Sequence, residues 1–281
     1  MVKILKAGII FILLGIGACV AGFLTTNDQV GNEFPDHTYT LVEGSYEIAE
    51  ISAINMDFDN RKVIVGQSTT DKIEVSYYVS ENDPIEVLSE TKSLTFDSDL
   101  IWYWNFFWGL SWLNWSSTQY YDFYLYLPEG TDFDLNIDTS NGAITVEAID
   151  NLGDLDLNTL NGKVTLSNID AKSIRVTTAN GIINVNNADC GTEGNIYLKT
   201  SNGSIDVTAI TMADLSCYTS NGAIDVTLVG EFTDYATNFA TANGSIYVDG
   251  NITTAGTYHA GNANQIILHT SNGSIHLDFL P

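Results

Sequence analysis

Basic residues and cysteines are scarce in this sequence of 281 residues. Ten lysines and arginines stand against 35 aspartates and glutamates, which gives a formal net charge of −25 at pH 7. Because this charge repels phosphate groups, nucleic-acid binding is excluded. Three cysteines are too few for a disulfide framework, and their spacing matches no zinc motif. We expect Cys190 and Cys217 to be two separate buried thiols, and we predict no zinc site.

An uncharged apolar run over residues 7–24 follows Lys3 and Lys6 near the N-terminus. This pattern predicts an export or anchoring segment over residues 1–24, with all later residues on the extracytoplasmic side of the membrane. Two anchors fit the run: a membrane-spanning helix, or a lipid on Cys19 within a lipobox-like sequence. Cleavage by a signal peptidase, which would release a soluble protein, is a third alternative.

The rest of the chain divides by composition into a linker and two β regions. Residues 25–38 are polar and predict a linker. Residues 39–121 alternate apolar and β-branched residues with polar ones, which predicts an N-terminal β region with a tryptophan-rich insertion at 101–115. Residues 122–281 contain sequence repeats.

The repeats are marked by seven Asn-Gly dipeptides spaced 19 to 29 residues apart. Each asparagine is preceded by threonine at the second position and by an apolar residue or cysteine at the fourth, and is followed by Ile or Val at the third and Val or Leu at the fifth. The unit is specific because its whole context recurs in register. The asparagines are Asn141, Asn161, Asn180, Asn202, Asn221, Asn243 and Asn272.

Two architectures can use this unit: a meander of hairpins, or a parallel β-solenoid in which each unit is one coil. The eighth residue after the asparagine is apolar in most units, whereas a straight hairpin arm would place its core residue at the seventh. This shift predicts a second bend, and therefore about seven stacked coils of ~20 residues. Right-handed crossovers are the general rule for parallel strands.

Stacked coils place equivalent side chains above one another. We therefore expect the threonines to point inward, and we expect the asparagines to form a buried ladder hydrogen-bonded from coil to coil. The glycine after each asparagine is expected to supply an unusual backbone angle.

Repeats such as Thr200–Val207 (TSNGSIDV), preceded by the segment Leu125–Gly130 (LYLPEG), resemble the putative-adhesin domains of bacteria and archaea. The resemblance covers roughly residues 45–281 and is strongest from residue 122 onward. It implies a right-handed β-helix-like fold and an exported or membrane-anchored protein. It carries over no catalytic residue.

The tryptophan-rich insertion departs from the pattern of that family. It contains every tryptophan of the chain, and two interpretations are open for it: a cap over the end of the solenoid core, or a surface that binds a membrane interface or a partner. The residues are Trp102, Trp104, Trp108, Trp112 and Trp115.

Stacking also brings acidic residues of neighbouring coils together. Like charges in such positions destabilise a sheet unless they are solvated, protonated or bridged by a cation. Solvation is the simplest expectation, since no calcium consensus is present, and Ca²⁺ is the candidate ion. The candidate cation-binding pairs are Asp206 with Asp225, Asp134 with Asp154, and Asp249 with Asp278.

No catalytic site can be recognised in the sequence. The repeats hold four basic residues, none of them in a motif with acidic residues, and no nucleophile, histidine base or phosphate loop is evident. The sequence therefore predicts a non-catalytic, membrane-tethered structural or binding module at the cell surface, whose partner is an unknown surface protein or glycan. The alternatives are a glycan-processing solenoid enzyme and an accessory or sensor protein of an envelope-stress system.

Overall fold

The computed structural model describes residues 39–48, 51–80, 83–90, 92–98 and 122–280. The chain divides into two compact units, and these residues belong to the second, which begins at Tyr39. Within them the fold is all-β, as predicted: the strands form one hydrogen-bonded network of 21, and the helical content is a single turn, η3 (Phe232–Asp234).

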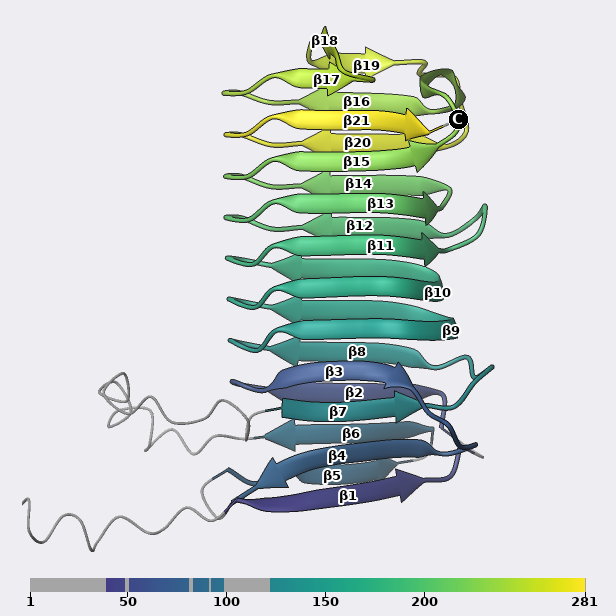
Figure 1. Cartoon of the computed structure of the whole chain (residues 1–281), viewed down its shortest axis with the longest axis vertical. Coiled ribbons are helices and arrows are strands. Elements are labelled where there is room, and N and C mark those ends of the chain that lie inside the picture. Colours follow the sequence, from purple (N-terminus) through teal and green to yellow (C-terminus); the bar gives the residue numbers. More distant parts are fainter. Residues whose placement is uncertain (1–38, 49–50, 81–82, 91, 99–121, 281) are drawn as a thin grey trace, which may run out of the picture. The chain divides into compact units, whose positions relative to one another are not determined.

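The strands form two rows, and most repeats contribute one strand to each row (Figure 1). All neighbours along the first row are parallel. In spatial order, the first row consists of β6 (Ser93–Ser98), β2 (Ala53–Phe58), β8 (Asp134–Thr139), the second halves of β9 (Ile144–Thr159) and β10 (Val164–Thr178), β12 (Asn195–Lys199), β14 (Asp214–Tyr218), β20 (Gln265–His269) and β16 (Ala236–Ala240).

The second row is parallel in the same way. In spatial order it consists of β7 (Asp122–Leu127), β3 (Lys62–Gln67), the first halves of β9 and β10, β11 (Ile183–Asp189), β13 (Ile205–Thr211), β15 (Ile224–Val229), β21 (Ile275–Leu280) and β17 (Ile246–Val248).

Antiparallel strands flank the parallel rows at both ends. At one end β4 (Ile73–Val79) pairs with β7 and with β1 (Thr40–Tyr46), and β5 (Glu86–Glu90) pairs with β6. At the other end β18 (Asn251–Thr253) pairs with β17, and β19 (Gly256–Tyr258) pairs with β16.

The pairing between repeats rules out the meander of hairpins. Ile144, Val164, Ile183 and Ile205, which are equivalent residues of successive units, are direct partners in parallel strands. A meander would instead pair neighbouring strands in antiparallel fashion. The predicted stacking of equivalent side chains is therefore correct.

A second bend occurs in the repeats, as the apolar eighth position indicated. The seventh residue after the asparagine has a left-handed backbone in four units: Ala148, Asn168, Asn187 and Ala209, with φ between 52° and 56°. This conformation turns the chain from the second row back toward the first, and it is unusual for residues with a Cβ.

The spatial order of the last two repeats is reversed relative to the sequence. Strands β20 and β21, from the repeat of Asn272, lie between the repeats of Asn221 and Asn243 (Figure 1). The cause is local: β18 and β19 fold back and pair with the outer edges of β17 and β16. Only the inner edges of these two strands stay open, and the final repeat occupies them.

One hydrophobic core runs through the described unit, from Ile54 in β2 to Leu277 in β21. The core continues across the boundary between residues 121 and 122, where the predicted N-terminal β region ends and the predicted repeats begin. This is because β2 pairs with β8 in the first row and β3 pairs with β9 in the second row. Cys190 and Cys217 lie in this core as separate buried thiols, as expected. Burial raises the pKa of Cys190 to about 12, and the charges of Asp189 and Asp170 add to the effect.

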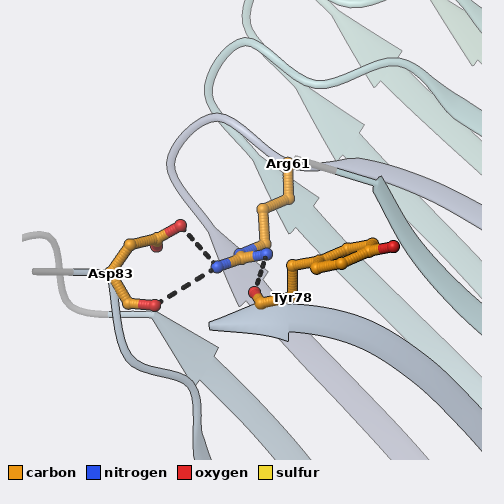
Figure 2. A network of polar contacts seen from close by, with 3 residues as sticks. All are labelled: Arg61, Tyr78 and Asp83. Carbon is orange, nitrogen blue, oxygen red and sulfur yellow. Dashed lines mark hydrogen bonds and ion pairs between the residues drawn. The ribbon is translucent and has the colours of Figure 1, made fainter. Parts of the chain in front are cut away.

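A buried ion pair closes the corner between β2 and β3. Arg61 donates from Nη2 to Asp83 Oδ2 at 2.6 Å and from Nη1 to the Tyr78 carbonyl at 2.9 Å (Figure 2). The Arg61 side chain is almost fully buried. The pair thus fastens the segment that follows β4 to this corner.

Candidate functional site

The repeat asparagines form a ladder along one edge of the stack. Asn161 donates to Asn141 at 2.6 Å, and the same bond recurs at every later corner in spatial order, ending with Asn243 on Asn272 at 2.8 Å. The ladder begins one step earlier than the sequence indicated, because Asn141 also donates to Asn60. Arg61 follows Asn60 in place of glycine, so no Asn-Gly dipeptide marked that corner.

The expectation that this ladder is buried is wrong: all seven repeat asparagines are exposed. Threonine occupies the inner position of the corner. Thr159, for example, is buried and donates to the Gly142 carbonyl at 3.1 Å while accepting from the Gly162 amide at 3.0 Å. The threonine hydroxyl therefore satisfies the backbone inside the corner, and the amide ladder lies on the outside.

Glycine is needed at these corners for space, which corrects the expected reason. None of the glycines in the Asn-Gly dipeptides has a positive φ. A Cβ on Gly162 would instead overlap the carbonyl oxygen of Gly142 in the neighbouring repeat. Backbones of successive corners approach too closely for any side chain.

The acidic pairs are neighbours as predicted, yet other groups already engage them. Asp206 is the register partner of Asp225, whose carboxylate lies 2.6 Å from His276 Nδ1. Asp134 accepts a hydrogen bond from the Asp154 backbone amide. In the third pair, Asp249 accepts one from the amide of Phe279, the residue after Asp278. No group of three metal-ligating side chains occurs among the described residues.

The predicted anchor and the tryptophans lie outside the described residues. Cys19 belongs to residues 1–38, and the five tryptophans belong to residues 99–121, between β6 and β7. No helix in the described part of the chain is long and apolar enough to cross a membrane.

A hollow of about 440 Å³ opens on the outer face of the first row, which we call the first face. Strands β6, β2, β8, β9 and β10 contribute to it, so it joins segments from both β regions. Its lining residues are Asn55, Met56, Asp57, Thr95, Asn136, Ile137, Asp138, Asp156, Asn158, Arg175 and Thr177.

Side chains of the hollow are linked from strand to strand by hydrogen bonds. Asn136 donates to Asn55 Oδ1 at 2.9 Å, and Asn158 donates to Asp138 Oδ2 at 3.0 Å. Arg175 Nε lies 4.0 Å from Asp156 Oδ2. The sequence had indicated no acidic partner for the basic residues of the repeats, and the register of β9 and β10 supplies this one.

The carboxylates give the hollow its electrostatic character. Burial raises the pKa of Asp156, the Arg175 charge opposes this, and the charge of Asp138 raises it further. Three aspartates and one arginine line the hollow, so its field is negative.

An aromatic row continues the first face beyond the hollow. The Arg175 guanidinium lies 4.6 Å from the ring centroid of Tyr197, a cation–π contact. The ring centroids of Tyr197 and Tyr218 are 5.6 Å apart, and those of Tyr218 and His269 are 5.5 Å apart. The two tyrosines and the histidine are half-buried, and burial lowers the pKa of His269.

This arrangement suits recognition of a polar ligand. It combines hydrogen-bond donors, acceptors and flat aromatic surfaces on a rigid sheet. Sequence patterns contain no direct signal of this site, because its residue types differ from repeat to repeat and β2 lies outside the Asn-Gly repeats.

Comparison with solved structures finds several similar chains. A putative adhesin from Bacteroides fragilis is 14% identical with a TM-score of 0.44, over 86% of this chain and 97% of the other. A putative cell adhesion protein from Clostridium sporogenes is 14% identical with a TM-score of 0.37, over 86% and 100% of the two chains. A putative lipid binding protein from Parabacteroides distasonis is 13% identical with a TM-score of 0.37, over 86% and 97%.

The search of curated proteins found no match. A family model, Toastrack DUF4097, matches residues 51–227 and again residues 151–278. The two matches together span most of the chain and overlap, as expected for a repeated unit. The likeness to putative-adhesin domains inferred from the Asn-Gly repeats is confirmed, and the chain belongs to the Toastrack DUF4097 family.

Proposed function

We propose that this protein is a non-catalytic binding module, tethered by residues 1–24 to the extracytoplasmic side of the membrane, that presents its first face to a partner outside the cell. The observation that carries this proposal is the hollow of about 440 Å³ on a sheet of stacked parallel strands. Concave sites with a few convergent polar groups are the usual form of ligand-binding sites.

Rigidity supports a binding role for the first face. The lining residues project from strands whose inner side chains belong to one buried core. A hydrogen-bonded sheet holds such groups in fixed positions, so little conformational entropy is lost when a ligand binds. We take the stack to be a right-handed β-solenoid of about seven repeat coils, because crossovers between parallel strands are usually right-handed.

The test is an array of extracellular oligosaccharides and surface proteins probed with the full chain in detergent. We expect at least one ligand to be captured and to be lost when Asn136→Ala and Asp156→Asn are combined. The matched control combines Asn186→Ala and Asp206→Asn on the outer face of the second row. Capture that survives the first pair of changes, or that depends on the control pair, would contradict the proposal.

One observation favours a second candidate, a glycan-processing enzyme: Asp138 and Asp156 both line the hollow. Two carboxylates across a glycosidic bond are the usual machinery of its hydrolysis. Prolonged incubation of a captured oligosaccharide with the protein distinguishes the two functions. A binding module returns the ligand intact, whereas shortened products that disappear with Asp156→Asn would establish the enzyme.

A further inference from the structure

The chemistry of the first face narrows the class of ligand, an inference that rests on the proposed function. The hollow offers amide and carboxylate groups on three adjacent strands, with Asn55, Asn136 and Asp156 as examples. An amide both donates and accepts hydrogen bonds, and a carboxylate accepts them. Sugar hydroxyls, which also donate and accept, match this set.

A protein hot spot would need a different lining. Such sites usually offer pockets for aromatic or aliphatic anchors. The apolar residues of the hollow, Met56 and Ile137, are 2% and 1% exposed, so their side chains belong to the core. The accessible side chains of the hollow therefore belong to Asn, Asp, Thr and Arg residues.

Tyr197 and Tyr218 supply the surface that a sugar ring needs besides hydrogen bonds. The faces of a pyranose ring are lined by C–H groups, which pack well on aromatic rings. Tyr197 on β12 is the register partner of Arg175 on β10. Tyr218 lies on β14, the next strand, diagonal to Tyr197. A ligand that occupies the hollow can therefore extend onto the tyrosines.

The direction of the ligand follows from the stacking. Adjacent strands are ~4.8 Å apart, so the first face from β2 to β14 spans about 24 Å along the stack. One strand spacing is close to the length of one extended sugar unit. A linear chain that lies across the strands can thus repeat similar contacts at successive strands.

The charge of the hollow selects against anionic chains. Asp57, Asp138 and Asp156 line it, and Arg175 is engaged by Asp156 and Tyr197. A uronate or sulfate group placed there would meet carboxylates at short range, which costs free energy. Uncharged sugars avoid this repulsion.

We propose that the ligand is an uncharged linear polysaccharide that lies along the stack, over the hollow and the Tyr197–Tyr218 surface. The amides and carboxylates bind its hydroxyl groups, and the tyrosines pack against its ring faces. Affinity therefore grows with the number of sugar units until the first face is covered.

The experiment is biolayer interferometry with the full chain in a zwitterionic detergent, which contains no sugar headgroup. The probes are cellohexaose and hexa-N-acetylchitohexaose, their disaccharides, and hexagalacturonate as the anionic probe of equal length. We expect a neutral hexasaccharide to bind, its disaccharide to bind far more weakly, and hexagalacturonate not to bind. Asn136→Ala and Tyr197→Ala should each weaken the affinity about tenfold, with unchanged circular dichroism.

Asn186→Ala, exposed on the second row, is the matched control and should leave the affinity unchanged. Stronger binding of hexagalacturonate than of the neutral probes would overturn the inference and leave the binding module standing. Binding of a protein, and of no oligosaccharide, through the first face would also overturn the inference and leave the binding module standing. If no ligand depends on the first face, the inference and the proposed function both fail.

Discussion

At each corner of the stack, three residues have three different structural roles. Thr159 satisfies the backbone inside the corner, Gly162 allows the neighbouring corner to approach, and Asn161 links corners on the outside. The three positions differ in burial: the threonine is buried and the asparagine is exposed. Because water can replace a lost partner only at the exposed position, the same deletion of a polar group should have different costs at the two sites.

Thr159→Val should therefore destabilise the protein by about 1 to 3 kcal/mol, because it leaves the Gly162 amide and the Gly142 carbonyl without a partner in a buried corner. Asn161→Ala in the same corner should cost at most about 1 kcal/mol, since water replaces its ladder bonds. Urea denaturation curves of the two variants give both values. Equal losses would show that the inner and outer positions do not differ as the structure indicates.

The Arg61–Asp83 pair leads to a second prediction at the residue scale. Its charges are nearly removed from water, with side-chain exposures of 2% and 10%. Asp83→Ala should cost about 3 to 5 kcal/mol, because it leaves the Arg61 charge buried without its counter-ion. The measurement is again urea denaturation.

The exposed pair of Lys72 with Glu47 provides the control. Lys72→Ala should cause no measurable loss of stability, since solvent screens this pair. The combined change Arg61→Met with Asp83→Leu should recover much of the loss seen in Asp83→Ala. A double variant as unstable as the single one would show that the contact of Arg61 with the Tyr78 carbonyl carries the stability instead.

At the scale of elements, the last repeat shows how a short hairpin can alter the order of strands. Strands β18 and β19 cover the outer edges of the Asn243 repeat. The Asn272 repeat therefore lies between the Asn221 repeat and the Asn243 repeat. The two orders differ in which outward residues become neighbours. Thr227 has Asp278 as its register partner, whereas stacking in sequence order would bring it next to Asp249.

Paired cysteines can therefore establish the strand order. In a chain with Cys19→Ser, the combination of Thr227→Cys and Asp278→Cys should form a disulfide, since parallel partners lie within bridging distance. The combination of Thr227→Cys and Asp249→Cys should stay reduced, because its two strands are separated by the inserted one. Non-reducing electrophoresis after mild oxidation detects the bond. A disulfide in the second combination alone would establish the sequence order.

Sequence periodicity was sufficient for the repeats and insufficient for the edges of the stack. The Asn-Gly spacing and the apolar third, fifth and eighth positions predicted strands, register and second bend, because stacking demands the same residue types in every coil. The insertion of β20 and β21 depends on the fold-back of residues 249–258, which follows no repeat. The Asn60 corner was missed because Arg61 takes the place of glycine there.

For the whole molecule, the candidate site depends on contacts between distant segments. Asn136 of β8 meets Asn55 of β2 across 81 residues of sequence. Side chains on the outer face are free to vary from repeat to repeat, whereas those of the core are constrained by packing. The first face therefore could not be derived from the repeat pattern, although that pattern places its residues once the pairing of β2 with β8 is known.

If stability is a sum over repeats and their interfaces, one complete repeat can be removed without loss of the fold. Deletion of residues 162–180 joins Asn161 to Gly181, so an Asn-Gly corner is rebuilt and β11 and β12 meet the strands of β9 in the old register. We expect a folded protein with a lower unfolding free energy. Circular dichroism and size-exclusion chromatography measure the outcome.

Deletion of residues 162–170 alone is the control for this test. It removes the corner glycine and the first half of β10, which lies in the second row. The second half of β10, which lies in the first row, stays in the chain without the strand that precedes it. That chain should aggregate or unfold, because core residues of β9 and β11 lose their neighbour and cannot close the gap in register. If both deletions fold equally well, register between repeats is not what holds the stack together. If both fail, the repeats are more strongly coupled than nearest-neighbour contacts allow.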